Sequence, residues 1–160
     1  MITAAVLTLS DKGAKGQRED ESGRVIRDFL KGMGWEVRHY EVLPDEKELI
    51  REALIKYSGT VSLILTTGGT GLGPRDVTPE ATAGVIEKEI PGIPEAMRAY
   101  GIGKTKRAML TRAVAGVRAG TLIINLPGSP KAVKESLEAI AEVIPHAVEK
   151  IKGSARECAG

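Results

Sequence analysis

The chain has 160 residues, a formal net charge of +2, one cysteine and 3% aromatic residues. So small a net charge argues against a broad nucleic-acid-binding surface, and so few aromatic side chains argue against a base-stacking platform. The single cysteine, Cys158, excludes an intrachain disulfide, and no apolar stretch reaches the roughly 18 residues that a membrane span needs. We therefore expect a cytoplasmic protein that binds neither nucleic acid nor a membrane.

Strands and amphipathic helices alternate through the first part of the chain. Short apolar runs rich in β-formers indicate strands, and apolar residues three or four positions apart indicate helices. Polar or glycine-containing turns separate these segments. On this basis we predict strands at residues 2–9, 35–43 and 61–65 and helices at about 25–33 and 49–57.

The second part of the chain starts with a helix whose expected N-cap is Thr78, followed by Pro79 at the first helical position. Three helix-breaking residues, at positions 91, 92 and 94, interrupt it. We then expect a short helix at 95–100, a strand pair at 114–118 and 122–126, and a long last helix from Ser129 to Ile151 that Pro145 should kink.

This alternation predicts an α/β fold with three layers: a mostly parallel sheet flanked by helices, with an antiparallel edge hairpin. Nothing in the sequence marks an internal boundary, so we expect a single domain over residues 1–152 and a short tail over 153–160.

Unusual polar segments follow four of the predicted strands. In an open parallel sheet, ligands bind beyond the carboxyl ends of the strands, which lie along one edge. We therefore expect these segments to converge on one site: residues 10–13, 44–46, 66–71 and 125–129.

The glycine-rich run Gly68–Gly71 is a candidate phosphate-binding loop. Glycines let the backbone approach a phosphate closely and turn its N–H groups toward it. The run is not a Walker A motif, because the Gly-Lys-Ser/Thr ending is absent, and Pro74 stands where a dinucleotide fingerprint needs glycine. A tight turn without a ligand explains the bare motif equally well, but its length, its place after a strand and the adjacent Arg75 and Asp76 favour phosphate.

A second candidate anion site is the turn Pro127–Pro130. Ser129 is placed to cap the last helix, and free N–H groups and a partial positive charge collect at a helix N-terminus. Capping alone explains the pattern, and anion binding would be an additional role.

Asp45 and Asp76 are the candidate chemical carboxylates. A carboxylate beside a phosphate loop repels the ligand unless a cation lies between them, and Mg²⁺ is commonly held by one or two carboxylates together with substrate phosphates. Spacing alone nevertheless favours a simpler role for Asp45, which with Glu48 resembles a helix-capping pair. Asp76 could equally brace its turn or pair with Arg75.

The remaining charged residues suggest less. His39 and His146 have no partner at metal-ligand spacing. A basic cluster of Lys104, Lys106, Arg107 and Arg112 is typical of a solvated face, with a phosphate-facing Arg112 as the alternative.

Several long motifs also carry a resemblance to one family. TTGGTGLGPRDVTPEAT (66–82) and LIINLPGSPKA (122–132) resemble the two signatures of the MogA/MoaB family of molybdenum-cofactor biosynthesis proteins, which is similar to the gephyrin G domain. SDKGAKGQREDESG (10–23), LPDE (43–46) and IPHA (144–147) match in the same order. The likeness covers roughly residues 2–152, but Thr111 stands where these proteins often have serine.

This resemblance implies a trimeric α/β protein that transfers AMP from Mg-ATP to the phosphate of molybdopterin and releases pyrophosphate. It places the two aspartates that the reaction needs at Asp45 and Asp76, with Mg²⁺ between them and the substrates. A MoeA-like molybdate-inserting protein would be a downstream partner. The residues expected to bind nucleotide or pterin are Ser10, Asp11, Thr67, Gly68, Gly69, Thr70, Gly71, Arg75, Thr78, Arg112, Asn125, Pro127, Gly128 and Ser129.

Three alternatives remain open. A MoaB-like protein could bind the pterin without efficient transfer. A scaffold of the gephyrin kind could act through its trimer. A CinA-type enzyme could hydrolyse a nucleotide without any pterin.

Overall fold

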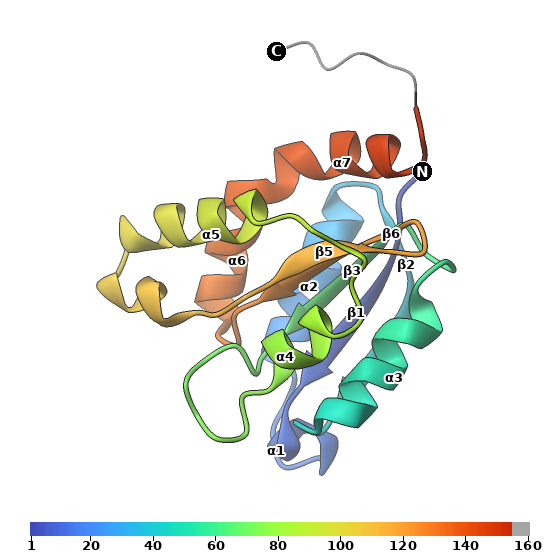
Figure 1. Cartoon of the computed structure of the whole chain (residues 1–160). Helices are drawn as coiled ribbons and strands as arrows, with labels where there is room; N and C mark the ends of the chain where they lie inside the picture. The colour runs from blue at the N-terminus through green and yellow to red at the C-terminus, as the bar shows by residue number, and fades with distance from the viewer. Residues whose placement is uncertain (155–160) are drawn as a thin grey trace.

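The computed structural model describes residues 1–154, so Cys158 and most of the expected tail lie outside the described residues. The elements in chain order (Figure 1) are β1 (Thr3–Leu9), α1 (Asp11–Ala14), α2 (Glu21–Gly32), β2 (Glu36–Leu43), α3 (Lys47–Tyr57), β3 (Leu63–Thr67), α4 (Thr78–Ala83), β4 (Lys88–Glu89), α5 (Gly92–Ile102), the 3₁₀ helix η1 (Lys106–Leu110), β5 (Ala115–Arg118), β6 (Thr121–Leu126), α6 (Pro130–Ile140), the 3₁₀ helix η2 (Ala141–Val143) and α7 (Ile144–Ile151).

One sheet forms the middle layer, with strand order β2-β1-β3-β6-β5-β4. The first four strands in this order are parallel, and β5 and β4 are antiparallel at one edge. The turn between β5 and β6 uses Ala119 and Gly120, both with positive φ, as tight hairpins require. The predicted mostly parallel sheet with an antiparallel edge hairpin is therefore confirmed.

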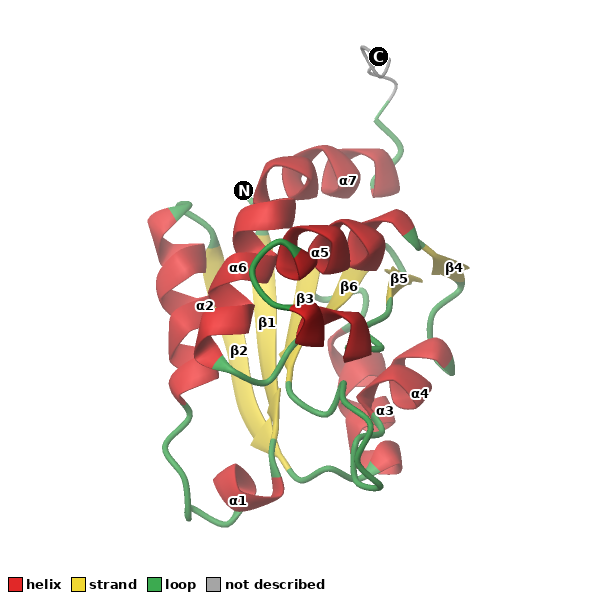
Figure 2. Ribbon diagram, turned by 90° about the vertical axis from the view of Figure 1, so that its left-hand side faces the viewer, coloured by secondary structure: helices red, strands yellow, loops and turns green. Residues whose placement is uncertain are grey.

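Helices cover both faces of the sheet (Figures 1 and 2). Successive residues of a strand point to opposite faces, so Ala4 and Val6 pack with one core and Ala5 and Leu7 with the other. The first core contains buried residues of α2, α5, α6 and α7, and the second contains those of α3 and α4. Within residues 1–154, no helix is long and apolar enough to cross a membrane.

Two predicted helix caps are wrong. Val77, not Thr78, is the N-cap of α4, because the buried Thr78 hydroxyl instead donates to the carbonyl of Gly68 at 3.0 Å. Glu46 is the N-cap of α3 and makes no side-chain cap bond, and the Asp45 carboxylate accepts from the backbone N–H of Asp11. Both side chains are thus directed toward the neighbouring loops rather than toward their own helices.

Other elements differ in extent. In place of the single kinked helix expected around Pro145, α6 ends at Ile140, the 3₁₀ helix η2 follows, and α7 starts at Ile144 with Pro145 in its first turn. Helix α2 begins earlier than its apolar pattern indicates, after the cap Asp20, and α5 spans Gly92–Ile102. The turn expected after β1 is the short helix α1, capped by Ser10.

Candidate active site

The carboxyl ends of the central strands lie level with one another. Leu9 at the end of β1 is opposite Leu43 of β2, and Thr67 at the end of β3 is opposite Leu126 of β6. The chain leaves β1 toward β2 on one side and returns to β3 on the other, which makes this the switch point where such sheets bind ligands. The predicted convergence of the loops that follow β1, β2, β3 and β6 is therefore confirmed.

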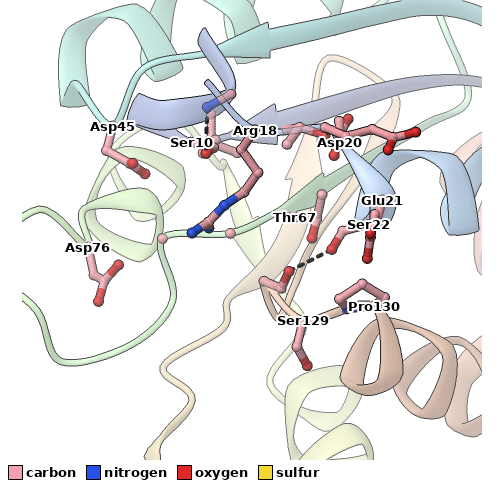
Figure 3. A pocket seen from close by; sticks show the side chains of 17 residues that line it. Ser10, Arg18, Asp20, Glu21, Ser22, Asp45, Thr67, Asp76, Ser129 and Pro130 are labelled. Atoms are coloured by element: carbon pink, nitrogen blue, oxygen red, sulfur yellow. Dashed lines mark hydrogen bonds between the residues drawn. The ribbon is translucent and has the colours of Figure 1, made fainter. Parts of the chain in front are cut away.

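A cavity of about 650 Å³ lies at this switch point (Figure 3). Its volume is within the range of ligand-binding pockets. Its lining comes from the ends of β1 and β3, the loop before α2, the loop before α3, the glycine-rich loop and the turn before α6.

Gly68 and Gly69 form the turn at the end of β3, and the backbone there requires glycine. Gly68 has φ 97° and Gly69 has φ 69°, in the left-handed region that other residues avoid. A Cβ on Gly68 would lie 2.3 Å from the carbonyl oxygen of Leu9, and a Cβ on Gly69 would lie 2.3 Å from the hydroxyl of Thr78. The two residues therefore let the loop pass close to β1 and α4 while their backbone lines the cavity.

Two helix N-termini meet at one end of the cavity. Asp20 caps α2 by accepting from Gly23 N–H at 2.9 Å, and Ser129 caps α6 by accepting from Ala132 N–H at 3.2 Å. The hydroxyl of Ser22 donates to the carbonyl of Gly128 at 2.6 Å and ties the two starts together. Free N–H groups and aligned peptide dipoles at these positions favour a bound anion.

A partly buried hydrogen-bond network holds Asp20 in place at this end. Thr8 donates to Oδ2 of Asp20 at 2.7 Å, and Tyr40 donates to the same oxygen. Burial, together with the hydrogen bond to Asp20, raises the pKa of Tyr40 to about 12. Tyr40 therefore stays a neutral donor at physiological pH, and Asp20 stays in position.

The opposite end of the cavity is acidic. Asp45 and Asp11 hold each other through reciprocal bonds, since each backbone N–H donates to the other's carboxylate at 2.9–3.0 Å. Burial, with the negative charges of Asp11 and Asp76, raises the pKa of Asp45 above its ordinary value. The carboxylate of Asp11 instead accepts two bonds from Arg75 at 3.0 Å, and these bonds are the main cause of its lowered pKa.

Arg75 is therefore the main cause of the lowered pKa of Asp11, and it also lowers the pKa of Asp45 to a smaller extent. In an Arg75→Met variant we expect the pKa of Asp11 to rise toward its ordinary value, and that of Asp45 to rise further, because Arg75 lowers both. A carboxyl pKa that is depressed by folding stabilises the protein above the unfolded value of about 3.9, and this contribution is lost as pH falls through the folded pKa. The loss of stability in the variant should thus be present at pH 7 and shrink below about pH 4.

Carboxyl-carbon NMR titration and urea unfolding at pH 7 and pH 3 would measure these effects. Arg38→Met is a matched control, because Arg38 pairs with Glu36 on β2 and does not line the cavity. An Asp11 titration that is the same in both variants would show that Arg75 does not set it.

Asp76 lies on the glycine-rich loop and faces the cavity across from Asp45 (Figure 3). Its Oδ2 accepts from Gly73 N–H at 2.8 Å, which closes the loop locally. Arg112 braces the same loop, since its guanidinium donates to the carbonyls of Gly71 and Asp76, both at 2.9 Å, and also contacts Glu80. Arg112 therefore fixes the backbone of the glycine-rich loop, and the hydrogen bond from Gly73 fixes the side chain of Asp76.

A family described as "Probable molybdopterin binding domain" matches residues 5–146. The chain belongs to this family. A Helicobacter pylori molybdopterin adenylyltransferase is 43% identical over 96% of this chain and 89% of its own length. Among solved structures, the molybdopterin biosynthesis enzyme MoaB of Thermus thermophilus is 49% identical over 96% of this chain and 98% of its own, with a TM-score of 0.90. The Mog protein of Mycobacterium ulcerans is 38% identical over 94% and 99%, with a TM-score of 0.89.

The structure brings half of the predicted site residues to the cavity wall. The lining residues among them come from all four converging segments and from position 76: Ser10, Asp45, Thr67, Gly68, Gly69, Asp76, Gly128 and Ser129. The predicted residues that do not line the cavity are Asp11, Thr70, Gly71, Arg75, Thr78, Arg112, Asn125 and Pro127.

Several residues of this second set support the lining residues. Asn125 is buried and donates to Thr66 and Thr82 while accepting from Val114 N–H, which joins β3, α4 and β6. The carbonyl of Pro127 accepts from Thr67 at 2.6 Å. These contacts, like those of Arg112, give the residues a positioning role in this structure.

The loop before α2 and the start of that helix also line the cavity, although no residue there is among the predicted site residues. The lining residues are Arg18, Glu19, Asp20, Glu21 and Ser22. They lie within the matched motif 10–23, but their polar composition alone resembles an ordinary exposed loop. The available signal was an N-cap pattern, since Asp20 precedes the apolar helix pattern by the spacing of a cap.

Proposed function

We propose that this protein is a molybdopterin adenylyltransferase, which transfers AMP from ATP to the phosphate of molybdopterin and releases pyrophosphate. The observation that carries the proposal is the composition of the cavity at the switch point. It combines anion-binding helix N-termini at one end with two aspartates beside a glycine turn at the other. A reaction between two phosphorylated substrates needs both kinds of site, and the family and the similarity to the Helicobacter pylori enzyme agree with it.

The helix N-termini of α2 and α6 suit the pterin phosphate. Their free N–H groups bind an anion without adding a formal charge, and Ser22 and Ser129 fix the two starts relative to each other. The backbone of Gly68 and Gly69 lies between this end and the aspartates and can approach a phosphate closely. The chain thus contributes mainly positioning and electrostatics, as is usual in phosphoryl transfer.

The two aspartates suit Mg²⁺ as part of Mg-ATP. Asp45 and Asp76 line the same cavity, and burial, with the negative charges of Asp11 and Asp76, raises the pKa of Asp45, so a bound cation would relieve this carboxylate. Within residues 1–154, no three His, Cys, Asp or Glu side chains form a metal cluster of their own, which fits an ion that takes its other ligands from substrate and water. Bound Mg²⁺ would neutralise charge on the triphosphate. Asp11, through its bonds to Asp45, would keep that carboxylate in position.

The decisive experiment mixes the pure protein with molybdopterin, ATP and Mg²⁺ and analyses the products. Adenylylated molybdopterin with an equal amount of pyrophosphate would establish the reaction. Tight pterin binding without AMP transfer would favour the MoaB-like binding or scaffold alternatives. Nucleotide hydrolysis that needs no pterin would favour the CinA-type alternative.

We also propose that the protein works as a homotrimer in the cytoplasm and passes its product to a MoeA-like molybdate-inserting protein. Exposed apolar side chains near the glycine-rich loop support an interface there, because Leu72, Met109 and Leu110 are 67%, 58% and 53% exposed. The proposed product, adenylylated molybdopterin, contains a phosphoanhydride bond, and cleavage of this bond can drive a following reaction. Sedimentation analysis would measure the oligomeric state.

A further inference from the structure

The cavity carries an uneven set of charges for a site that binds two polyanions. Five lining residues are carboxylates, and Arg18 is the one cation among the described residues that line it. The carboxylates are Glu19, Asp20, Glu21, Asp45 and Asp76. Bound Mg²⁺ offsets charge only near Asp45 and Asp76, so charge elsewhere in the cavity depends on the helix N-termini and on Arg18.

Arg18 has no protein partner that would explain its place. Among residues 1–154, no hydrogen bond or ion pair involves its guanidinium, although the next three residues are all acidic. Glu19 pairs with Arg24 at 3.2 Å, and Asp20 is satisfied by Gly23, Thr8 and Tyr40. A long cationic side chain that only solvated the surface would turn outward, whereas Arg18 projects into the cavity (Figure 3).

The position of Arg18 is central. In Figure 3 its guanidinium lies between the Asp45 and Asp76 carboxylates on one side and Ser22 and Ser129 on the other. The first side is the proposed ATP end and the second the proposed pterin-phosphate end. The bond that forms between the substrates must lie between these two ends, which is where the guanidinium is directed.

We propose that Arg18 is a catalytic residue that binds the phosphoryl oxygens of the transferring α-phosphate, an inference that rests on the proposed function. An oxygen of the pterin phosphate forms a bond to the α-phosphorus. The bond from that phosphorus to the oxygen bridging to the β-phosphate breaks, and its electron pair leaves with pyrophosphate. Arg18 stabilises the negative charge on the phosphoryl oxygens, which is greatest as the two bonds exchange. Its planar fork of N–H donors matches phosphoryl oxygens better than a lysine ammonium does.

Turnover of Arg18→Ala, Arg18→Lys and Lys15→Ala tests this role. Lys15 is exposed on the same loop outside the cavity lining, so its replacement removes the same charge without touching the site. A group that acts on the transition state should lower kcat more than it raises KM. We expect kcat of Arg18→Ala to fall on the order of 100-fold, with a much smaller change in KM for ATP. Added guanidinium ion should restore part of the activity, Arg18→Lys should be intermediate, and Lys15→Ala should resemble the parent protein.

The outcomes separate this inference from the proposed function. If the parent protein forms adenylylated molybdopterin, a kcat of Arg18→Ala that equals that of Lys15→Ala overturns the role of Arg18. If the parent forms no product, the proposed function fails, and calorimetric binding of inorganic pyrophosphate with Mg²⁺ decides on Arg18 instead. Weaker pyrophosphate binding by Arg18→Ala than by Lys15→Ala would then support the phosphate contact, and equal binding would overturn it.

Discussion

Replacing Asp45 with asparagine is expected to lower the rate of AMP transfer on the order of 10²–10³-fold, while the protein folds as before. The substitution removes the charge that would hold Mg²⁺ but keeps an oxygen that can accept from the backbone N–H of Asp11, now at 3.0 Å from Oδ2. Because the hydrogen bond survives, the loop after β2 should keep its shape. The expected loss is therefore one of charge at the site and not of structure.

The free energy of unfolding of Asp45→Asn should not fall together with its rate of AMP transfer. Burial raises the pKa of Asp45 in the folded protein, so the folded state binds this proton more tightly than the unfolded state does. The charged carboxylate therefore reduces stability once the pH exceeds that raised pKa, and the penalty disappears below the unfolded value of about 3.9. Asp45→Asn should accordingly be at least as stable as the parent at pH 7, and the two should converge in acid.

Pyrophosphate release and urea unfolding, measured side by side, would check both expectations. Asp28→Asn is the matched control, since Asp28 is exposed on α2 and outside the cavity. Transfer by Asp45→Asn at the rate of Asp28→Asn would contradict the metal-binding role. A marked fall in stability at pH 7 would instead indicate that the carboxylate mainly supports the loop.

The contacts of Asp45 in the structure also show a limit of prediction from local sequence patterns. Its spacing to Glu48 is typical of a capping pair, and helix α3 does begin close by. Whether the side chain caps that helix depends on the distant Asp11, whose backbone N–H competes for the carboxylate. Local spacing contains no information about that competitor. The place of Asp45 after a strand and the family resemblance favoured a role at the site.

The sheet could be predicted more completely than the wall of the cavity, because burial leaves a local pattern in the sequence and a role in the cavity does not. Runs of apolar residues directly indicate buried segments. Periodicity and the rules for parallel sheets therefore predict strands β1, β2, β3 and β6 and the convergence of their carboxyl ends. Arg18 lies in a polar segment that would look the same on an ordinary surface loop. Arg112 shows the converse, because a side chain in a basic cluster turns out to brace the glycine-rich loop through two carbonyls.

The second large effect is expected at Gly68, where alanine should lower the free energy of unfolding by about 2–5 kcal/mol. Two costs combine at this position. The φ of 97° disfavours any residue with a Cβ, and the added atom would lie 2.3 Å from the carbonyl oxygen of Leu9. Leu9 cannot move away easily, because its strand β1 is paired with β2 on one side and with β3 on the other.

Urea unfolding would measure this loss against Gly32→Ala. Gly32 ends helix α2, where an added Cβ would meet no atom within 4 Å, so that variant should be unchanged or more stable by about 0.5 kcal/mol. Equal stability of the two variants would contradict the close approach of the turn to β1. Where Gly68→Ala still folds, AMP transfer should fall as well, because relief of the contact with Leu9 must shift backbone that lines the cavity. The same glycine thus links the packing of the sheet to the placement of the phosphates.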